Sequence, residues 1–276
     1  MKEFLNENTL FSTILMLSEP NSLLLIVEGE YDQLLLKKHC TENLEILSGT
    51  GGKEQVLRAA SRARKYNLKN VHFLVDRDYD DFSPKYSYSS YDYNVHCSKS
   101  HDIFMDLIIN DWKNFQYLLE VEAQGCKNLK IPNLIDIKEE AISLASCLAV
   151  VRILNVKSDL GLNFKRFSVH KFNTKVNFDI TTIEKILNHF ETENIESLMT
   201  ESRNIYNLVS KSVEYIIGDH DLFEAIARGF KSKKGKDIQK TFIFGASCLS
   251  ITNTNWYSEI QSWCREYNCE GFNCKV

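Results

Sequence analysis

Three carboxylates stand directly after two apolar segments, and they are the residues of this sequence best placed to do chemistry. Glu28 follows the segment 23–27 (LLLIV), and Asp76 and Asp78 follow a segment that ends in FLV at 73–75. Short apolar segments of this kind predict strands buried on both faces of a parallel sheet. Ligands of such sheets bind beyond the carboxyl ends of the strands, so the three acids converge if the two strands are neighbours. Clustered carboxylates repel one another unless a cation lies between them, and an all-oxygen site suits Mg²⁺ or Mn²⁺.

The elements that must position these acids alternate between strands and helices. The expected strands cover 23–27, 44–47, 71–75 and 93–97. The expected helices cover 4–17, 31–40, the stretch from the 49–53 loop through Lys65, and 102–110. This alternation predicts right-handed βαβ units and therefore a parallel sheet.

The second half of the sequence has a helical pattern instead. Apolar residues from Ile137 onward recur at helical spacing, and further helices are expected over 181–190, 195–217 and 219–230. We therefore predict an α/β chain in three parts: an N-terminal helix in 1–20, a catalytic domain in 21–125 and a mostly helical domain in 126–276.

Composition limits the class of protein. The chain has 276 residues, 43% of them hydrophobic and 25% charged, which predicts a globular protein with a sizeable core. A net charge of −4 argues against non-specific coating of nucleic acid but is compatible with a local basic groove. No uninterrupted apolar stretch reaches the length of a spanning helix, and no basic segment leads into an apolar one at the N-terminus. Neither a membrane span nor a signal peptide is therefore expected.

The eight cysteines are spread along the chain and include no Cys-x-x-Cys pair. Cys264, Cys269 and Cys274 are five residues apart, which fits neither a zinc knuckle nor one face of a helix. Reduced thiols in a cytoplasmic protein are the favoured interpretation, ahead of a zinc site.

The order of the strand-end motifs resembles that of the TOPRIM domain, the metal-dependent fold of topoisomerases, primases and OLD-type nucleases. The two signatures of that family are a strand ending in Glu-Gly and a later strand ending in Asp-x-Asp, and here they are VEGEYD and VDRDYD. Further segments extend the resemblance to small TOPRIM effectors of bacterial anti-phage systems of the PARIS type. They are GTGGK at 49–53, SHDIFMDL at 100–107, LGLNFK at 160–165 and GDHDLFEAIARGF at 218–230.

The resemblance implies a role for each acid. Glu28, Asp76 and Asp78 would hold two Mg²⁺ or Mn²⁺ ions and act in catalysis. Asp102 is the expected fourth ligand. Relatives usually carry Asp-Ile-Glu at this point, whereas Phe104 stands at the Glu position here, so Asp106, one helical turn after Asp102, is the alternative. The competing interpretation is that these acids only cap helix N-termini, where negative charge is favourable.

The GTGGK loop is not a Walker A motif, because it lacks the four-residue spacing and Glu54 follows the lysine. Any ATP is therefore expected to be bound by a partner. Lys53 at a helix N-terminus could hold a backbone phosphate and assist catalysis, or the loop could simply be a turn that needs positive φ. His220, in the GDHD motif, is expected to be a hydrogen-bonded core histidine.

Two segments could contact nucleic acid. The stretch 228–240 has six basic residues and one acid, which could follow a phosphate backbone or simply be solvated. The candidate contacts there are Lys231, Lys233, Lys234 and Lys236. The tyrosine-rich segment 79–93 could stack on unpaired bases or form a partner surface.

These observations together predict a metal-dependent endonuclease, with RNA, and tRNA in particular, favoured over DNA as substrate. The resemblance implies a toxic effector controlled by an ABC-type ATPase partner, cytoplasmic, and a homodimer when free. Two alternatives remain open: an OLD-type DNA nickase that uses the same site, and a catalytically inactive TOPRIM scaffold that binds the ATPase and senses a phage product.

Overall fold

A computed structural model describes residues 7–19, 22–83, 91–126, 129, 133–164, 167–172, 176–190, 195–230 and 233–274. The chain divides into two compact units, each made of segments that are distant in sequence. The first unit comprises Met1–Arg77, Tyr88–Asp111 and Ala246–Val276, and the second comprises Asp78–Ser87 and Trp112–Gly245.

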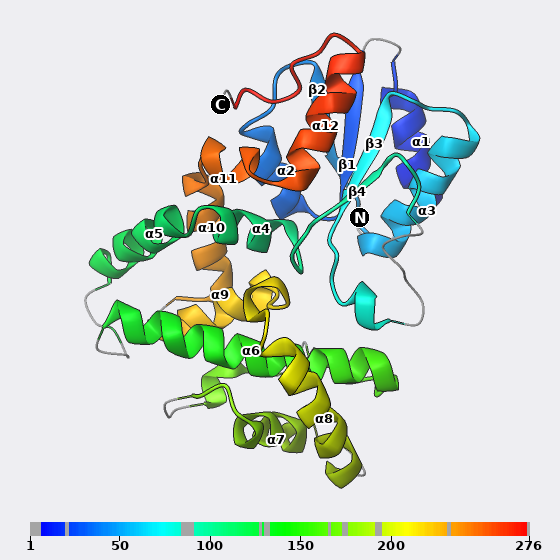
Figure 1. The fold of residues 1–276 in the computed structure, drawn as a ribbon. Helices are drawn as coiled ribbons and strands as arrows, with labels where there is room; N and C mark the ends of the chain where they lie inside the picture. The colour runs from blue at the N-terminus through cyan, green and yellow to red at the C-terminus, as the bar shows by residue number, and fades with distance from the viewer. Residues whose placement is uncertain are drawn as a thin grey trace. The chain divides into compact units, whose positions relative to one another are not determined.

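The first unit is built on a four-stranded parallel sheet with the order β2-β1-β3-β4 (Figure 1). Its strands are β1 (Leu23–Val27), β2 (Leu44–Ser48), β3 (Val71–Val75) and β4 (Val95–Cys97). Every residue of β1 and β3 is buried, as expected for central strands covered on both faces. Val27 of β1 is in register with Leu74 of β3, so the two strands end almost level with each other.

Six helices accompany this sheet. They are α1 (Glu7–Leu17), α2 (Glu30–Lys37), α3 (Gly52–Lys65), α4 (Ile103–Asn110), α11 (Cys248–Thr252) and α12 (Asn255–Glu266). Side chains of α1 and α3, among them Phe11 and Val56, form one hydrophobic core with Ile26 and Phe73 of the sheet. On the opposite face His72 of β3 stacks on Trp263 of α12, with ring centroids 4.0 Å apart.

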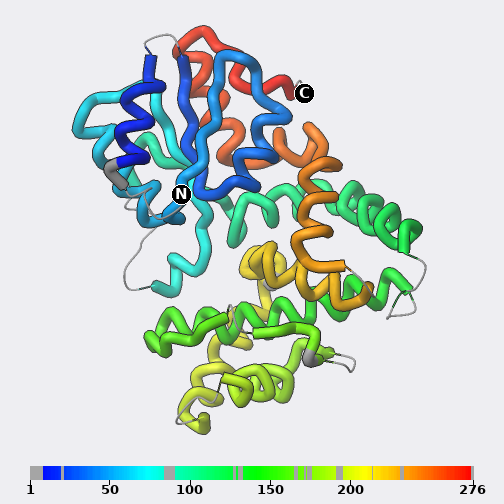
Figure 2. Tube along the Cα trace, turned by 180° about the vertical axis from the view of Figure 1, so that it is seen from behind, coloured from blue at the N-terminus to red at the C-terminus, as the bar shows by residue number. Residues whose placement is uncertain are grey.

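The second unit is helical and is centred on α6 (Leu134–Ser158). Its other helices are α5 (Trp112–Gln124), α7 (Ile180–His189), α8 (Ile195–Val209), α9 (Asp219–Ala227) and α10 (Gly235–Gly245), with short 3₁₀ turns at Asp80–Phe82, Val169–Lys171 and Val213–Tyr215. Helices α7, α8 and α9 pack directly on α6 (Figures 1 and 2). The predicted fold class, an α/β part with a parallel sheet followed by a mostly helical region, is confirmed.

Helix α6 differs from expectation in one respect. It has 25 residues and is apolar enough to cross a membrane by length and composition, although no such stretch was expected. Most of it is buried in the second unit, and its Arg152 is bound to Asp221 of α9 by hydrogen bonds of 2.6 and 2.8 Å. This is the burial of a core helix.

The end of the chain also differs from the sequence-based division. The sequence predicts that residues 126–276 form one helical domain, but α11 and α12 belong to the sheet unit. Helix α12 buries Trp256, Ile260 and Trp263 along one side, and this apolar stripe packs in the first unit. The hydrophobic pattern of a helix predicts that one face is buried but does not identify the surface that covers it.

Candidate functional site

Glu28 and Asp76 meet at the carboxyl ends of the two central strands. The backbone N–H of Asp76 donates to Glu28 Oε1 at 2.9 Å, and the backbone N–H of Ile103 donates to Asp76 Oδ1 at 3.0 Å. These two bonds join the ends of β1 and β3 to the first turn of α4. The structure thus brings together two of the three acids on which the sequence analysis began.

Asp32 and Asp102 add two buried acids to this end of the sheet. Asp102 is the N-cap of α4 and accepts a hydrogen bond from the Met105 N–H at 2.7 Å. Burial raises the pKa of Asp32 to about 7; a hydrogen bond from the Gly29 N–H works against that rise, and the charge of Asp102 adds to it. A raised carboxyl pKa beside another acid indicates a position where additional negative charge is unfavourable.

Asp32 was missed as a site residue by the sequence analysis. It follows Glu28 by four residues, in the first turn of α2, and its oxygen Oδ2 lies 2.8 Å from the Gly29 nitrogen. The signal was present in the sequence: an acid one helical turn beyond a strand-end acid lies over the same end of the sheet.

Asp106, the alternative fourth ligand, already serves the fold. Its Oδ1 accepts from the Ser100 N–H at 2.7 Å, and its Oδ2 accepts from the Lys99 N–H at 2.9 Å and from Trp256 Nε1 at 3.2 Å. Phe104 is buried, at 3% exposure. We therefore favour Asp102 over Asp106 as the candidate fourth ligand.

Lys53 lies at the same end of the sheet. Its ammonium donates hydrogen bonds to the backbone carbonyls of Asp76 and Arg77, the latter at 3.1 Å. The preceding Gly52 has φ +70°, so the loop also contains the turn that needs a glycine. Both interpretations of GTGGK, a turn and a cation beside the acids, are therefore compatible with the geometry.

Asp78 belongs to the second unit, unlike Glu28 and Asp76. Its backbone is left-handed, with φ 51°, which is unusual for a residue other than glycine. Burial lowers the pKa of Arg152, but the ion pair with Asp221 and the charges of Tyr79 and Asp78 raise it above its usual value. Arg152 is thus within electrostatic reach of Asp78.

The basic segment offers fewer phosphate contacts than its composition suggests. Lys231 lies outside the described residues. Lys233 forms an ion pair with Glu122 at 2.5 Å, and Arg228 is buried against Glu140. Lys234 and Lys236 are exposed. Of the tyrosine-rich segment, 84–90 is outside the described residues and Tyr79 is buried.

The prediction that His220 is a core histidine is wrong. His220 is exposed in the first turn of α9, whereas Asp219 and Asp221 on either side of it are buried. Asp219 accepts a hydrogen bond from Gln239 at 2.8 Å and Asp221 binds Arg152. In the GDHD motif the two acids are therefore the buried residues, because both have hydrogen-bond partners inside the second unit.

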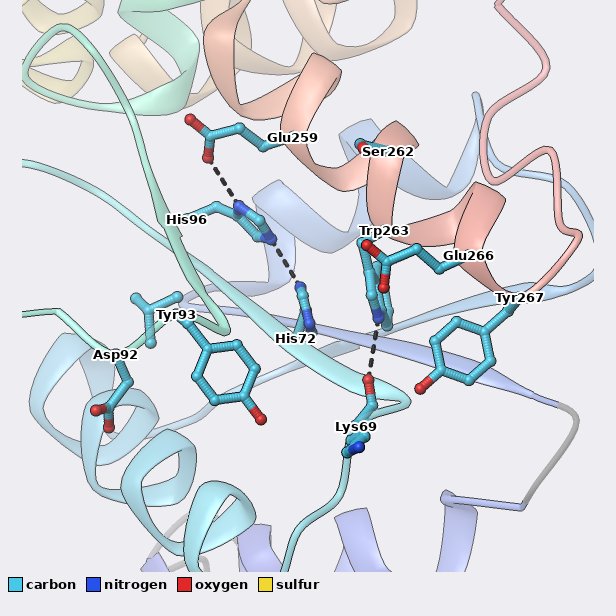
Figure 3. A pocket seen from close by; sticks show the side chains of 11 residues that line it. Lys69, His72, Asp92, Tyr93, His96, Glu259, Ser262, Trp263, Glu266 and Tyr267 are labelled. Carbon is cyan, nitrogen blue, oxygen red and sulfur yellow. Dashed lines mark hydrogen bonds and ion pairs between the residues drawn. The ribbon is translucent and has the colours of Figure 1, made fainter.

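A cavity of 610 Å³ lies beside α12 on the His72 face of the sheet (Figure 3). Glu259 Oε2 is 2.8 Å from His96 Nδ1, and His96 Nε2 is 2.9 Å from His72 Nδ1. Burial, with a smaller contribution from His96, lowers the pKa of His72 to about 3, so this ring is neutral at ordinary pH. The arrangement links a half-exposed carboxylate through His96 to a buried, neutral ring. Its sequence signal was a histidine inside each of two apolar strands.

The thiols differ from expectation in one pair. A disulfide joins Cys248 to Cys274, while the other six cysteines form no disulfide, although reduced thiols were expected throughout. The pair forms because the C-terminal segment folds back beside α11, which brings together two cysteines 26 residues apart.

No family model matches the chain, and no curated protein is significantly similar to it. The geometry of the acids therefore carries the functional argument.

Proposed function

We propose that this chain is a metal-dependent TOPRIM nuclease that hydrolyses phosphodiester bonds. The observation that supports it is the hydrogen bond from the Asp76 N–H to Glu28 at the ends of adjacent parallel strands, with Asp76 bonded in turn to Ile103, the residue after Asp102. Simple helix capping accounts for Asp102 and for one oxygen of Asp76. It does not account for Glu28, whose partner is the end of a neighbouring strand.

The donor set fits a hard divalent cation. All of its members are carboxylates, the ligands that such cations prefer. The pKa of Asp32 is raised first by burial, and the charge of Asp102 adds a smaller repulsion that a cation would relieve. Glu28, Asp76 and Asp102 would hold Mg²⁺ or Mn²⁺, and Asp78 stays a predicted further ligand. When bound, the ion would polarise a phosphoryl oxygen and lower the pKa of a bound water.

The chain's own residues would position the substrate around that ion. Lys53 places an ammonium at the end of β3, where it can offset the charge of a phosphate. The bond from the Asp76 N–H fixes one oxygen of Glu28, so that the carboxylate is oriented before substrate arrives.

The finer resemblance, to AriB, the effector subunit of the PARIS system, favours tRNA or another RNA as the substrate. It also favours an ABC-type ATPase that restrains the nuclease and releases it as a homodimer. These remain parts of the same proposal.

The test uses the purified full-length chain with Mg²⁺ or Mn²⁺ and three substrates: total tRNA, single-stranded DNA and supercoiled DNA. We expect tRNA cleavage that EDTA stops and that Glu28→Gln or Asp76→Asn abolishes. Glu45→Gln is the matched control, because Glu45 is an exposed acid on the neighbouring strand β2. Nicking of the supercoiled DNA alone would favour the OLD-type alternative. No cleavage of any substrate, with or without the ATPase, would favour the scaffold.

A further inference from the structure

Three side chains capable of binding a soft metal converge at the C-terminal end of the first unit. His39 follows α2, Cys248 begins α11, and Cys274 lies in the last segment of the chain. Their ligand atoms all lie within 4.8 Å of one another. His39 and Cys274 are buried, at 6% and 4% exposure, and Cys248 is partly buried.

Two of the three distances match those of a tetrahedral zinc site. The third does not, because the two sulfurs are bonded to each other here and must move to about 3.8 Å apart once the disulfide is reduced. His39 Nδ1 is 3.7 Å from Cys248 Sγ and 3.6 Å from Cys274 Sγ. A Zn–N bond of about 2.0–2.1 Å and a Zn–S bond of about 2.3 Å that meet at a tetrahedral angle separate N and S by about 3.6 Å. The imidazole nitrogen is therefore already at ligand distance from both sulfurs.

Hydrogen bonds to the backbone hold His39 and Cys274 in place independently of their own side chains. The N–H of Asn273 donates to the carbonyl of His39 at 2.7 Å, and the N–H of Thr41 donates to the carbonyl of Gly271 at 2.8 Å. Tyr257 Oη donates to the carbonyl of Cys274 at 3.0 Å. The last segment is thus tied both to the end of α2 and to α12, which preorganises the ligands.

The His39 ring has a polar environment that the protein leaves incomplete. Its Nδ1 contacts the two sulfur atoms, which are weak hydrogen-bond partners, so a metal bound at Nδ1 would replace weak contacts by a coordinate bond. Nε2 is buried and has no hydrogen-bond partner among the described residues. With a metal at Nδ1, Nε2 would carry the ring proton and would need a water as acceptor.

We propose that His39, Cys248 and Cys274 bind one Zn²⁺ when the disulfide is reduced, with the fourth position open to water or another small ligand. Cys274 also lines a pocket of 730 Å³, which brings solvent to one side of the cluster. The proposal is independent of the proposed nuclease activity, since it uses none of the acids at the sheet end.

The chemistry balances in two steps. A dithiol reductant transfers its two thiol hydrogens to Cys248 and Cys274 by exchange and becomes a disulfide itself. Zn²⁺ then displaces two protons, forms two Zn–S bonds and accepts the Nδ1 lone pair of neutral His39. In the disulfide state there are no thiolates to bind the ion, so oxidation and zinc binding exclude each other.

The test titrates zinc into reduced, chelator-treated full-length protein, in competition with a chromophoric chelator. We expect one equivalent per chain, which is lost on oxidation. Affinity should fall more than about 100-fold in Cys274→Ser or His39→Asn, because even the groups behind a ligand are worth up to about 100-fold. Cys40→Ser is the matched control: Cys40 is a free cysteine next to His39 and outside the cluster.

Three results would overturn the proposal. In the first, the oxidised protein binds zinc as tightly as the reduced protein does. In the second, the reduced wild type binds zinc no more tightly than Cys274→Ser does. In the third, Cys40→Ser loses as much zinc affinity as Cys274→Ser does. A measurement on the wild type avoids variants that fail to fold. Zinc should slow alkylation of Cys248 and Cys274, mapped by mass spectrometry, and leave the rate at Cys126 unchanged; equal rates with and without zinc would reject the site.

Discussion

The first unit contains two clusters of ligand-type side chains, and they differ in chemistry and in origin. At the carboxyl end of the sheet, Glu28 and Asp76 present only oxygen, from strands whose ends are adjacent. At the C-terminal segment, His39, Cys248 and Cys274 present nitrogen and sulfur from positions up to 235 residues apart. The first cluster suits a hard, exchangeable cation, and the second suits a soft one held tightly.

The difference shows what a repeated topology contributes. Parallel strands all have their carboxyl ends at the same edge of a sheet. Acids that directly follow two neighbouring strands therefore lie close together, whatever the packing of the rest of the chain. No comparable rule places a histidine after α2 beside a cysteine at the end of the chain. That cluster depends on how the last segment packs.

The largest effect should come from breaking the oxygen cluster alone. Glu28→Gln keeps an acceptor for the Asp76 N–H but removes a negative charge, so cleavage should fall about 100-fold or more, a barrier increase of about 2.7 kcal/mol. Single-turnover cleavage of the preferred substrate measures this. Zinc affinity of the reduced protein should stay unchanged, and a parallel loss of zinc would show that the two clusters are not independent.

The next effect is a pH dependence of stability at the oxygen cluster. The folded pKa of Asp32, about 7, is above its ordinary value of 3.8, so its contribution to stability is fully present below about pH 4 and is lost as pH rises through 7. In metal-free protein, Asp32→Asn should therefore gain stability over the wild type between pH 4 and 7, by up to about 4 kcal/mol.

Urea unfolding at several pH values, with EDTA, measures that gain. Added Mg²⁺ should reduce it, because a cation favours the ionised carboxylate. If the extra stability of Asp32→Asn did not vary with pH, the pKa of Asp32 would not be raised in the folded protein.

A smaller effect should separate the structural acid from the functional ones. Asp106→Ala leaves the Lys99 and Ser100 amides and Trp256 Nε1 without their acceptor, so the free energy of unfolding should fall by about 1–3 kcal/mol. Glu28→Gln should leave it level or raise it, since repulsion decreases. Denaturant titration of both variants makes the comparison, and equal losses would place Glu28 among the structural acids.

The smallest effect is expected at the exposed lysines. Lys234→Ser with Lys236→Ser should flatten the salt dependence of nucleic-acid binding by up to about two units, because each lost phosphate contact is worth about one unit. Binding measured from low to moderate salt tests this. An unchanged slope would move the phosphate contacts elsewhere, with Lys53 at the sheet end as the first candidate.

The sequence alone determined the two central strands of the sheet and the acids that follow their carboxyl ends. Apolar segments at 23–27 and 71–75 matched β1 and β3 residue for residue, and Glu28 and Asp76 followed them as predicted. A local pattern is enough to predict these features, because a short apolar segment of about five residues already indicates a buried strand and the end at which the acids lie.

Only the tertiary structure decided the remainder. It gave Asp106 a hydrogen bond from the indole of Trp256, 150 residues away, and it exposed His220 while burying the acids beside it. It also placed α12 and the last cysteine with the sheet. These outcomes depend on which surfaces pack together, and a helix's pattern records that one face is buried but not what covers it.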